Sequence, residues 1–304
     1  MLKTINIQSL FGFYSYSLPI INSDNNAISF ITGPNGYGKT TILRIINFLY
    51  NQQYDLLANI LFDKLELLFD DGYILEVSQE RTIEQEENMD VEGYTNVQLN
   101  MHFFHQTRND FHENFKWNSH SSQEIIINNF STYLSSHPIY FIKDNRLYHQ
   151  DQSSVKQNAI NLSKLLNDPK NNQSNSFQQK VSAFKKIINS YGFTNKTLQI
   201  APRYGYRFIA TNNDSSILSY DNLSSGEQHI LIMTYDLLFN ADDDSLILID
   251  EPELSFHLEW QGIFLNSLET IGQLRSIQCI VCTHSPEIFR YQWNMSIDLF
   301  KQLN

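Results

Sequence analysis

GPNGYGKT, at residues 33–40, matches the pattern G-x-x-x-x-G-K-[ST]. An apolar run that predicts a strand precedes it, AISFITG at 27–33, and a segment with helical spacing follows it, TTILRIINFLY at 40–50. A strand, a glycine-rich loop and a helix in this order are the structural context of a loop that binds phosphate. We therefore expect this loop to bind a nucleotide, rather than to be a glycine-rich turn without a ligand.

The residues of the loop have separate roles in this prediction. Glycines allow backbone N–H groups to converge on the phosphates, and the helix that follows adds the positive end of its dipole. The Lys39 ammonium is expected to reach the β- and γ-phosphates of ATP, and the Thr40 hydroxyl to bind Mg²⁺. The residues that we expect to contact ATP here are Gly33, Asn35, Gly36, Gly38, Lys39, Thr40 and Thr41.

A second candidate segment, LILIDEPE at 246–253, is an apolar run that ends in acids. Such a run is typical of a buried parallel strand, and ligands bind at the carboxyl ends of strands in open α/β sheets. Asp250 is suited to the Mg²⁺ shell, and Glu251 is placed to act as the general base that polarises water. Acids often end strands, so the prediction depends on the presence of the loop at 33–40.

The third candidate segment is LSSGEQ at 223–228. A Ser-Gly pair that opens a helix offers backbone N–H groups and a hydroxyl to an anion. The structural alternative is an ordinary helix N-cap at Ser225, with Glu227 in the first turn.

LSSGEQ, LILIDEPE and the THS at 283–285 together resemble the signature, Walker B and switch-histidine motifs of ABC ATPases. The resemblance implies that Ser225 and Gly226, with Ser224 beside them, bind the γ-phosphate held by another subunit, so that ATP lies between two chains. It also implies that His284 contacts the γ-phosphate and senses hydrolysis; a surface histidine that caps a helix is the alternative. LSFH at 254–257 matches the family's D-loop, which crosses the dimer interface.

The spacing indicates which branch of the family this is. Transporter subunits have a much shorter segment between the phosphate-binding loop and the signature, and their signature reads SGGQ. The motifs here resemble the AAA family ATPases related to the OLD and SMC-like groups, and the ATPase subunits of phage-defence systems such as PARIS and Septu. We expect neither the nuclease domain of OLD proteins nor the long coiled coil of SMC proteins.

The predicted fold is therefore an α/β P-loop NTPase of ABC type. It is a two-lobed ATPase head with a mixed β-sheet, an antiparallel β subdomain and a helical insertion. We expect one head over 1–304, divided into a P-loop lobe with the β subdomain (1–145), the insertion (146–195) and the signature and Walker B lobe (196–304). The predicted strands are 7–18, 27–33, 64–69, 73–80, 94–104, 137–144, 246–250 and 277–283, with a hairpin at 198–212, and the predicted helices are 40–50, 121–134, 152–191 with a loop at 167–176, 223–239 and 256–274.

Composition limits the classes of function. The net charge is −12 and no dense Lys/Arg run is present; the nearest group, which we interpret as ordinary surface, is Lys185, Lys186, Lys196, Arg203 and Arg207. No apolar stretch approaches the roughly 20 residues of a membrane span, and no signal peptide is evident, so we expect a cytoplasmic protein without membrane contact. Cys279 and Cys282 lie in the apolar run IQCIVC, which predicts buried thiols rather than a zinc or redox site.

Two assignments stay open. Asp144 or Asn145 lies nearest to the position of the family's Gln-loop. The aromatic run Phe11, Phe13, Tyr14 and Tyr16 either contacts the base of ATP, as in related ATPases, or packs into the core.

The expected function is that of a regulatory subunit that binds and hydrolyses ATP, an oligomeric switch for a separate effector such as a nuclease or another toxin. Its cofactors would be ATP and Mg²⁺, and its partners a second copy of itself and the effector. A DNA-binding ATP-gated clamp is the alternative, which the acidic total charge disfavours. A scaffold that binds ATP without hydrolysis is a third possibility, which Glu251 disfavours.

Overall fold

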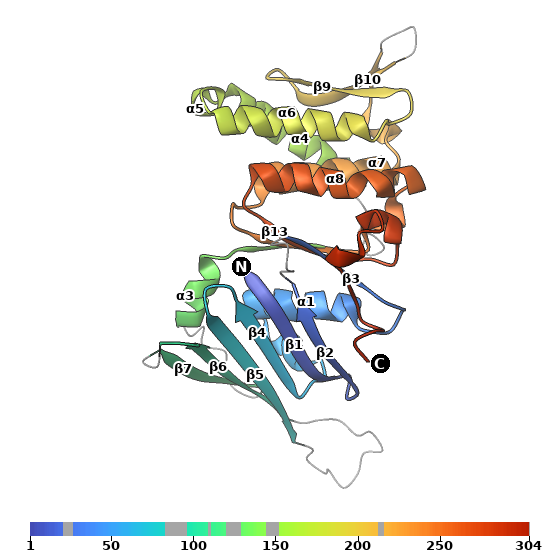
Figure 1. Cartoon of the computed structure of the whole chain (residues 1–304). Helices are drawn as coiled ribbons and strands as arrows, with labels where there is room; N and C mark the ends of the chain where they lie inside the picture. Colours follow the sequence, from blue (N-terminus) through green and yellow to red (C-terminus); the bar gives the residue numbers. More distant parts are fainter. Residues whose placement is uncertain are drawn as a thin grey trace, which may run out of the picture.

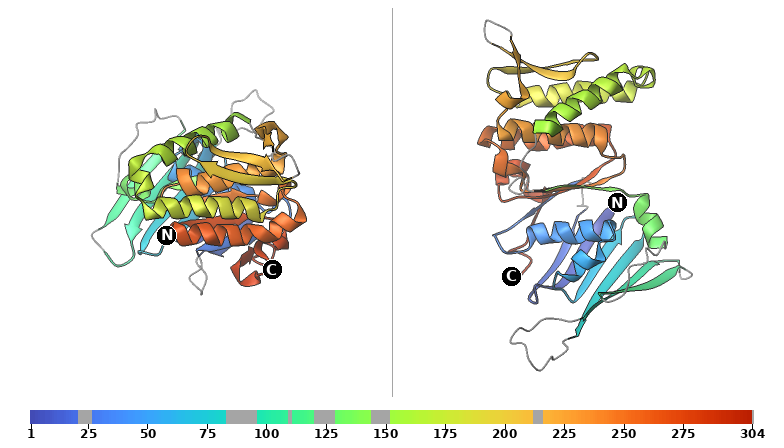
Figure 2. Two further views of the ribbon diagram at one scale, coloured as in Figure 1. Left: turned by 90° about the horizontal axis from the view of Figure 1, so that it is seen from above. Right: turned by 180° about the vertical axis from the view of Figure 1, so that it is seen from behind.

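The computed structural model describes residues 1–20, 27–82, 96–108, 111–119, 129–143, 152–211 and 216–303. Within them the elements stack in layers, which Figure 1 shows edge-on. From top to bottom these are a small antiparallel sheet, two layers of helices, a parallel sheet, helix α1 (Lys39–Tyr50) and a large antiparallel sheet. Figure 2 shows the same order from behind. This is the α/β architecture that the sequence predicts. Instead of the expected mixed sheet, however, parallel and antiparallel strands of the described residues lie in separate sheets.

The parallel sheet is the central layer. Its strand order is β14-β3-β13-β12-β8, and every pairing is parallel. All five residues of β12 and of β13 are buried, which explains why both strands are continuous apolar runs. The strands are β3 (Ile28–Thr32), β8 (Ile139–Ile142), β12 (Leu246–Asp250), β13 (Gln278–Cys282) and β14 (Ser296–Asp298).

Alternate residues of the central strands point into two different hydrophobic cores. Ile247 and Ile249 of β12 belong to the core shared with the helical layers, whereas Leu246 and Leu248 belong to the core shared with α1 and the large antiparallel sheet. Because successive side chains of a strand point to opposite faces, one short strand connects both halves of the molecule. Cys279 and Cys282 are free, fully buried thiols, as predicted, and burial raises the pKa of Cys279 to about 12.

The large antiparallel sheet has the order β2-β1-β4-β5-β6-β7. Strand β4 alternates between half-buried and buried residues, because one face packs on the core and the other faces solvent. The tight turn at 70–72 joins β4 and β5, as predicted. The strands are β1 (Leu2–Leu10), β2 (Tyr14–Pro19), β4 (Lys64–Phe69), β5 (Tyr73–Thr82), β6 (Asn96–His105) and β7 (His112–Asn118), and the short helices beside them are α2 (Tyr54–Ala58) and α3 (Asn129–Ser135).

The single strand predicted over 7–18 is wrong. The chain reverses there, and β1 and β2 pair as an antiparallel hairpin. Phe11 and Gly12 have φ angles of 57° and 88°, in the left-handed region that turns the chain and that glycine adopts easily. Strand β7 was not predicted, because only Phe115 and Trp117 give its otherwise polar sequence HENFKWN an apolar face, and both are only partly buried against the core.

The remaining helices, α4 to α8, lie in two layers above the parallel sheet in Figure 1. The polar stretch predicted as a loop at 167–176 contains a short helix, whose N-cap Asp168 accepts a hydrogen bond from the Lys170 N–H at 2.9 Å. None of the helices in the described ranges has the length and apolar character of a membrane-crossing segment. The helices are α4 (Gln152–Asn167), α5 (Pro169–Asn172), α6 (Asn175–Ser190), α7 (Ser225–Tyr235) and α8 (Leu258–Leu274), and the small sheet consists of β9 (Lys196–Ala201), β10 (Gly205–Ala210) and β11 (Ile217–Leu218).

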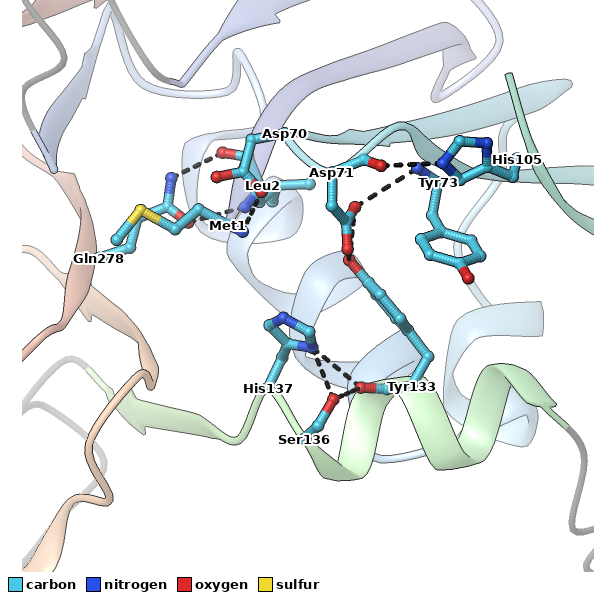
Figure 3. Close-up of polar contacts among 10 residues, drawn as sticks. All are labelled: Met1, Leu2, Asp70, Asp71, Tyr73, His105, Tyr133, Ser136, His137 and Gln278. Atoms are coloured by element: carbon cyan, nitrogen blue, oxygen red, sulfur yellow. Dashed lines mark hydrogen bonds and ion pairs between the residues drawn. The ribbon is translucent and has the colours of Figure 1, made fainter. Parts of the chain in front are cut away.

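Polar contacts join the first strand to the parallel sheet (Figure 3). The buried amide of Gln278 accepts a hydrogen bond from the Leu2 N–H at 2.9 Å and donates one to the Leu2 carbonyl at 2.6 Å. Close by, the Tyr133 hydroxyl is within 3.1 Å of both carboxylate oxygens of Asp71. The two bonds of Gln278 fix the amino end of β1 against the amino end of β13, whereas the loop at 33–40 follows the carboxyl end of the neighbouring parallel strand β3.

Candidate nucleotide site

The phosphate-binding loop connects β3 to α1, as predicted. Gly38 is the N-cap of α1 with φ 89°, a backbone conformation that favours glycine, and a Cβ atom there would also displace the end of the Leu10 side chain, 2.8 Å away. The Lys39 ammonium donates hydrogen bonds to the loop carbonyls of Gly33 at 2.9 Å and Pro34 at 3.1 Å. The lysine therefore crosses the concave side of the loop, where a phosphate would be bound.

Lys39 is 5% exposed, and burial lowers the pKa of its ammonium from the ordinary value. The neighbouring acids Glu251 and Asp250 oppose that decrease. A buried cation at the N-terminus of a helix is suited to an anionic ligand.

Thr40, in α1, and Asp250, the last residue of β12, are in direct contact. The Thr40 hydroxyl donates to the Asp250 carboxylate at 3.1 Å, and Asp250 is 4% exposed. A hydroxyl and a carboxylate are oxygen ligands of the kind that Mg²⁺ uses together with phosphate oxygens. The two predicted metal ligands, separated by most of the chain, thus fit one Mg²⁺ site, while Asn35 and Gly36 lie exposed on the loop and Thr41 lies half-buried in α1.

Glu251 follows β12 in a left-handed backbone conformation with φ 46°. Its N–H donates to the Cys282 carbonyl at 2.8 Å, which joins the carboxyl ends of β12 and β13. The carboxylate then lies 3.3 Å from Nε2 of His284. A non-glycine residue in this region stores strain, which is typical of functional sites. His284 is not the cap of the 3₁₀ turn that follows, since Ser285 has that position.

The signature segment opens α7, but its N-cap is Ser224, not Ser225 as the structural alternative supposed. The Ser224 hydroxyl accepts from the Glu227 N–H at 3.3 Å, and the Glu227 carboxylate accepts from the Ser224 N–H at 2.7 Å. Because Ser224 takes the capping role, the exposed Ser225 hydroxyl is not used for it.

Gly226 is the point of closest approach within this segment. A Cβ atom there would collide with the Ser255 carbonyl and lie 3.1 Å from the Trp260 ring. The signature is thereby packed against the predicted D-loop at 254–257 of the same chain.

The signature does not share a face of the sheet with the phosphate-binding loop. Helix α7 lies above the parallel sheet in Figure 1, and α1 lies below it. The structure brings together Lys39, Thr40, Asp250, Glu251 and His284, whereas Ser224, Ser225 and Gly226 belong to a separate part of the molecule.

The aromatic run at 11–16 lies partly in the core and partly at the surface beside the loop at 33–40, and its contact with the base of ATP stays a prediction. Tyr16 is 3% exposed in the core, and its hydroxyl donates to the Tyr37 carbonyl in the phosphate-binding loop at 2.8 Å. The Tyr14 and Tyr37 rings stack with centroids 5.3 Å apart, and Phe13 is 67% exposed beside them. Sequence reasoning missed Tyr37, whose only signal was an aromatic residue at a variable position of the motif.

Two further contacts were not predicted. The Glu253 carboxylate accepts from the His284 N–H at 2.6 Å, and the Glu227 carboxylate accepts from the Lys196 ammonium at 2.8 Å. Lys196 is therefore an internal partner rather than part of a basic surface group. Asp144 and Asn145, the candidates for the Gln-loop position, lie outside the described residues.

Comparison with known proteins gives a family and a fold. A family model described as "AAA domain, putative AbiEii toxin, Type IV TA system" matches residues 96–290. The SMC head bound to the C-winged helix domain of ScpA matches over 94% of this chain and 90% of that chain, with TM-score 0.50 and 11% identity. The SMC head domain from Thermotoga maritima covers 95% and 90%, with TM-score 0.48 and 15% identity. An Smc head with an extended coiled coil, derived from Pyrococcus furiosus, covers 95% and 90%, with TM-score 0.47 and 12% identity.

At such identities the first of these structures supports the fold alone, the two-lobed ABC-type ATPase head that the sequence predicts. No curated protein matches the chain in a sequence search.

Proposed function

The chain belongs to the AAA-domain family of that model, and on this premise we propose that it hydrolyses ATP as an oligomeric switch that controls a separate effector in antiphage defence. The observation that carries the proposal is the convergence of Lys39, Thr40, Asp250, Glu251 and His284 at the carboxyl ends of β3, β12 and β13. ATP-dependent phosphoryl transfer needs a phosphate cradle, a metal site and a group that orients water, and each has a candidate here.

The proposed chemistry is transfer of the γ-phosphoryl group to water. The Glu251 carboxylate accepts a proton from the attacking water, and the Lys39 ammonium stabilises the charge that develops on the phosphate oxygens. His284, 3.3 Å from Glu251, donates a hydrogen bond to the γ-phosphate. Mg²⁺ held by Thr40 and Asp250 would neutralise charge on the β- and γ-phosphates.

The second half of the site comes from another copy of the chain. Ser224, Ser225 and Gly226 form the start of α7, which lies on the opposite side of the parallel sheet from α1 (Figure 1). Contact with the γ-phosphate is therefore proposed across a dimer, with ATP between the two chains. Exposed apolar side chains on segments that follow β12 and β14 support such an interface: Leu254, Leu258, Phe300 and Leu303 are 37% to 70% exposed.

The effector is a further part of the proposal. The matched family model includes in its description a toxin of a type IV toxin–antitoxin system. The sequence motifs resemble the ATPase subunits of PARIS and Septu, which act with separate effectors. We propose that ATP-driven closure of the dimer holds the effector and that hydrolysis changes that contact.

The test is the solution mass and ATP turnover of wild type, Glu251→Gln and the control Glu269→Gln. We expect Mg-ATP to drive assembly, and Glu251→Gln to retain the assembled form while turnover falls by about 10²- to 10⁴-fold. Glu269, on the distal half of α8, should be replaceable without effect. Failure of the wild type to bind ATP would end the proposal, and a mass independent of ATP would remove the switch. Salt-sensitive DNA binding would favour the clamp instead.

A further inference from the structure

A second acid near the candidate general base contacts the turn that holds His284. Glu253 lies in the 3₁₀ turn Pro252–Ser255, two residues after Glu251. One of its carboxylate oxygens accepts a hydrogen bond from the His284 N–H at 2.6 Å. The other is buried, without a hydrogen-bond partner among the described residues. The carboxylate thus links the segment after β12 to the segment after β13.

The backbone conformation places the two glutamates of the segment, Glu251 and Glu253, against His284. Glu251 reverses the chain with φ 46°, and Pro252 begins the 3₁₀ turn. The Glu251 carboxylate then faces the His284 ring at 3.3 Å, and the Glu253 carboxylate faces the His284 backbone. A hydrogen bond from an N–H to an ionised carboxylate is about twice as strong as one between neutral groups, so Glu253 is a firm anchor for this residue.

The rest of the turn is held independently. The Thr283 hydroxyl accepts from the Ser285 N–H at 3.0 Å, and the Ser285 hydroxyl donates to the Gln261 side chain at 2.6 Å. These contacts fix the residues on either side of His284. Loss of Glu253 would therefore release His284 itself while its neighbours stay in place.

We propose that Glu253 is a positioning residue for ATP hydrolysis. Its carboxylate fixes the backbone of His284, so that the imidazole is aligned with Glu251 and with the γ-phosphate. Glu253 does not contact ATP or the attacking water. This inference rests on the proposed function, because alignment of His284 affects a rate only in a chain that hydrolyses ATP.

The first experiment compares wild type with Glu253→Gln and Glu253→Ala. We expect kcat to fall by about tenfold for Glu253→Gln, which keeps a neutral acceptor, and by about a hundredfold for Glu253→Ala, while KM and ATP affinity stay unchanged. The matched control is Glu287→Gln, since Glu287 is an acid in the same region without a bond to His284. Unchanged kcat in Glu253→Ala, with an active wild type, would overturn the proposal.

A double-mutant cycle separates positioning from a general loss of structure. In a His284→Ala background, Glu253→Gln should cause no further loss of kcat, because its effect acts through the missing imidazole. Losses that multiply would show that Glu253 acts in another way.

Amide hydrogen exchange of His284 gives a readout that does not depend on turnover. Exchange at this amide should be faster in Glu253→Ala than in wild type, with exchange in the cores unchanged. Equal exchange in both proteins would overturn the inference. If exchange responds as expected but the wild type has no turnover, the proposed function fails, while the hydrogen bond between Glu253 and the His284 N–H is still supported.

Discussion

At Gly226 the absence of a side chain determines how closely two functional segments pack. The Ser255 carbonyl and the Trp260 ring occupy the space that a Cβ atom would need. The contact joins the first turn of α7 to the segment that follows Glu251. A residue of the proposed trans site and the predicted D-loop are therefore rigidly connected inside one chain.

Gly226→Ala should separate these segments. We expect a loss of about 1–3 kcal/mol in the free energy of unfolding from overpacking, and loss of ATP-dependent assembly in the Glu251→Gln background. ATP binding by Lys39 should remain, because the substitution is remote from the loop. The control is Gly272→Ala in α8, where a Cβ atom would meet nothing within 4 Å; alanine there should stabilise by ~0.5–1 kcal/mol. Urea unfolding and solution mass measure both variants, and equal behaviour of the two would contradict the packing argument.

Elements with a continuous or strictly alternating apolar pattern were predictable, and the others were not. Strands β12 and β13 are apolar throughout because both faces are covered, and β4 alternates because one face is solvated. Helix α7 was predicted to run on to residue 239, but it ends at Tyr235 and a π-helical segment, Asp236–Asn240, follows. Its apolar residues continue through both segments, so the local pattern did not indicate the change.

An ion pair between the outermost sheet and α7 holds the start of this helix. Lys196 of β9 and Glu227 of α7 form an ion pair at 2.8 Å, with side chains 16% and 5% exposed. Glu227 also completes the capping box with Ser224. The outermost sheet therefore contributes to the position of the signature, although nothing in the sequence paired these two residues.

Lys196→Met should leave the Glu227 carboxylate buried without its cation. We expect the free energy of unfolding to fall by about 3–5 kcal/mol, with weaker ATP-dependent assembly. The matched control is Lys64→Met, which breaks the exposed pair with Glu76 at 2.9 Å and should cost about 0–1 kcal/mol. Chemical denaturation compares the two, and similar losses would show that the buried pair has no special role.

At the scale of the whole molecule, the predicted site is assembled from both ends of the sequence. Motif spacing predicted that Lys39, Thr40, Asp250 and Glu251 belong to one site, because the chemistry of phosphate binding restricts the residue types, and the structure brings them together. It could not show that Tyr37 stacks on Tyr14 or that Glu253 bonds to His284, since these contacts depend on how separate loops pack.

The many buried tyrosines make a prediction for the whole fold. Burial raises the pKa of each of these phenols, so they stay protonated in the folded chain and ionise at about pH 10 in the unfolded chain. The unfolded state then binds fewer protons than the folded state, and stability falls as pH rises above about 10. The tyrosines concerned are Tyr16, Tyr50, Tyr54, Tyr133, Tyr191, Tyr206, Tyr220 and Tyr235.

Urea unfolding at about pH 8 and about pH 11 checks this expectation. The midpoint should be lower at the higher pH, and phenolate absorbance should increase together with loss of structure. A midpoint that does not change, or no further increase in phenolate absorbance on unfolding at the higher pH, would contradict it.

The strand order has a consequence for synthesis on the ribosome. Strand β3, which begins at Ile28, pairs in the described structure with β13 and β14, which begin at Gln278 and Ser296. A nascent chain must therefore carry β3 and the loop behind it without their sheet neighbours until residue 278 has left the exit tunnel. A chain that stops before this point lacks β13, the strand that lies between β3 and β12. The loop at 33–40 and the acids at 250–251 are then not held together as they are in the complete sheet.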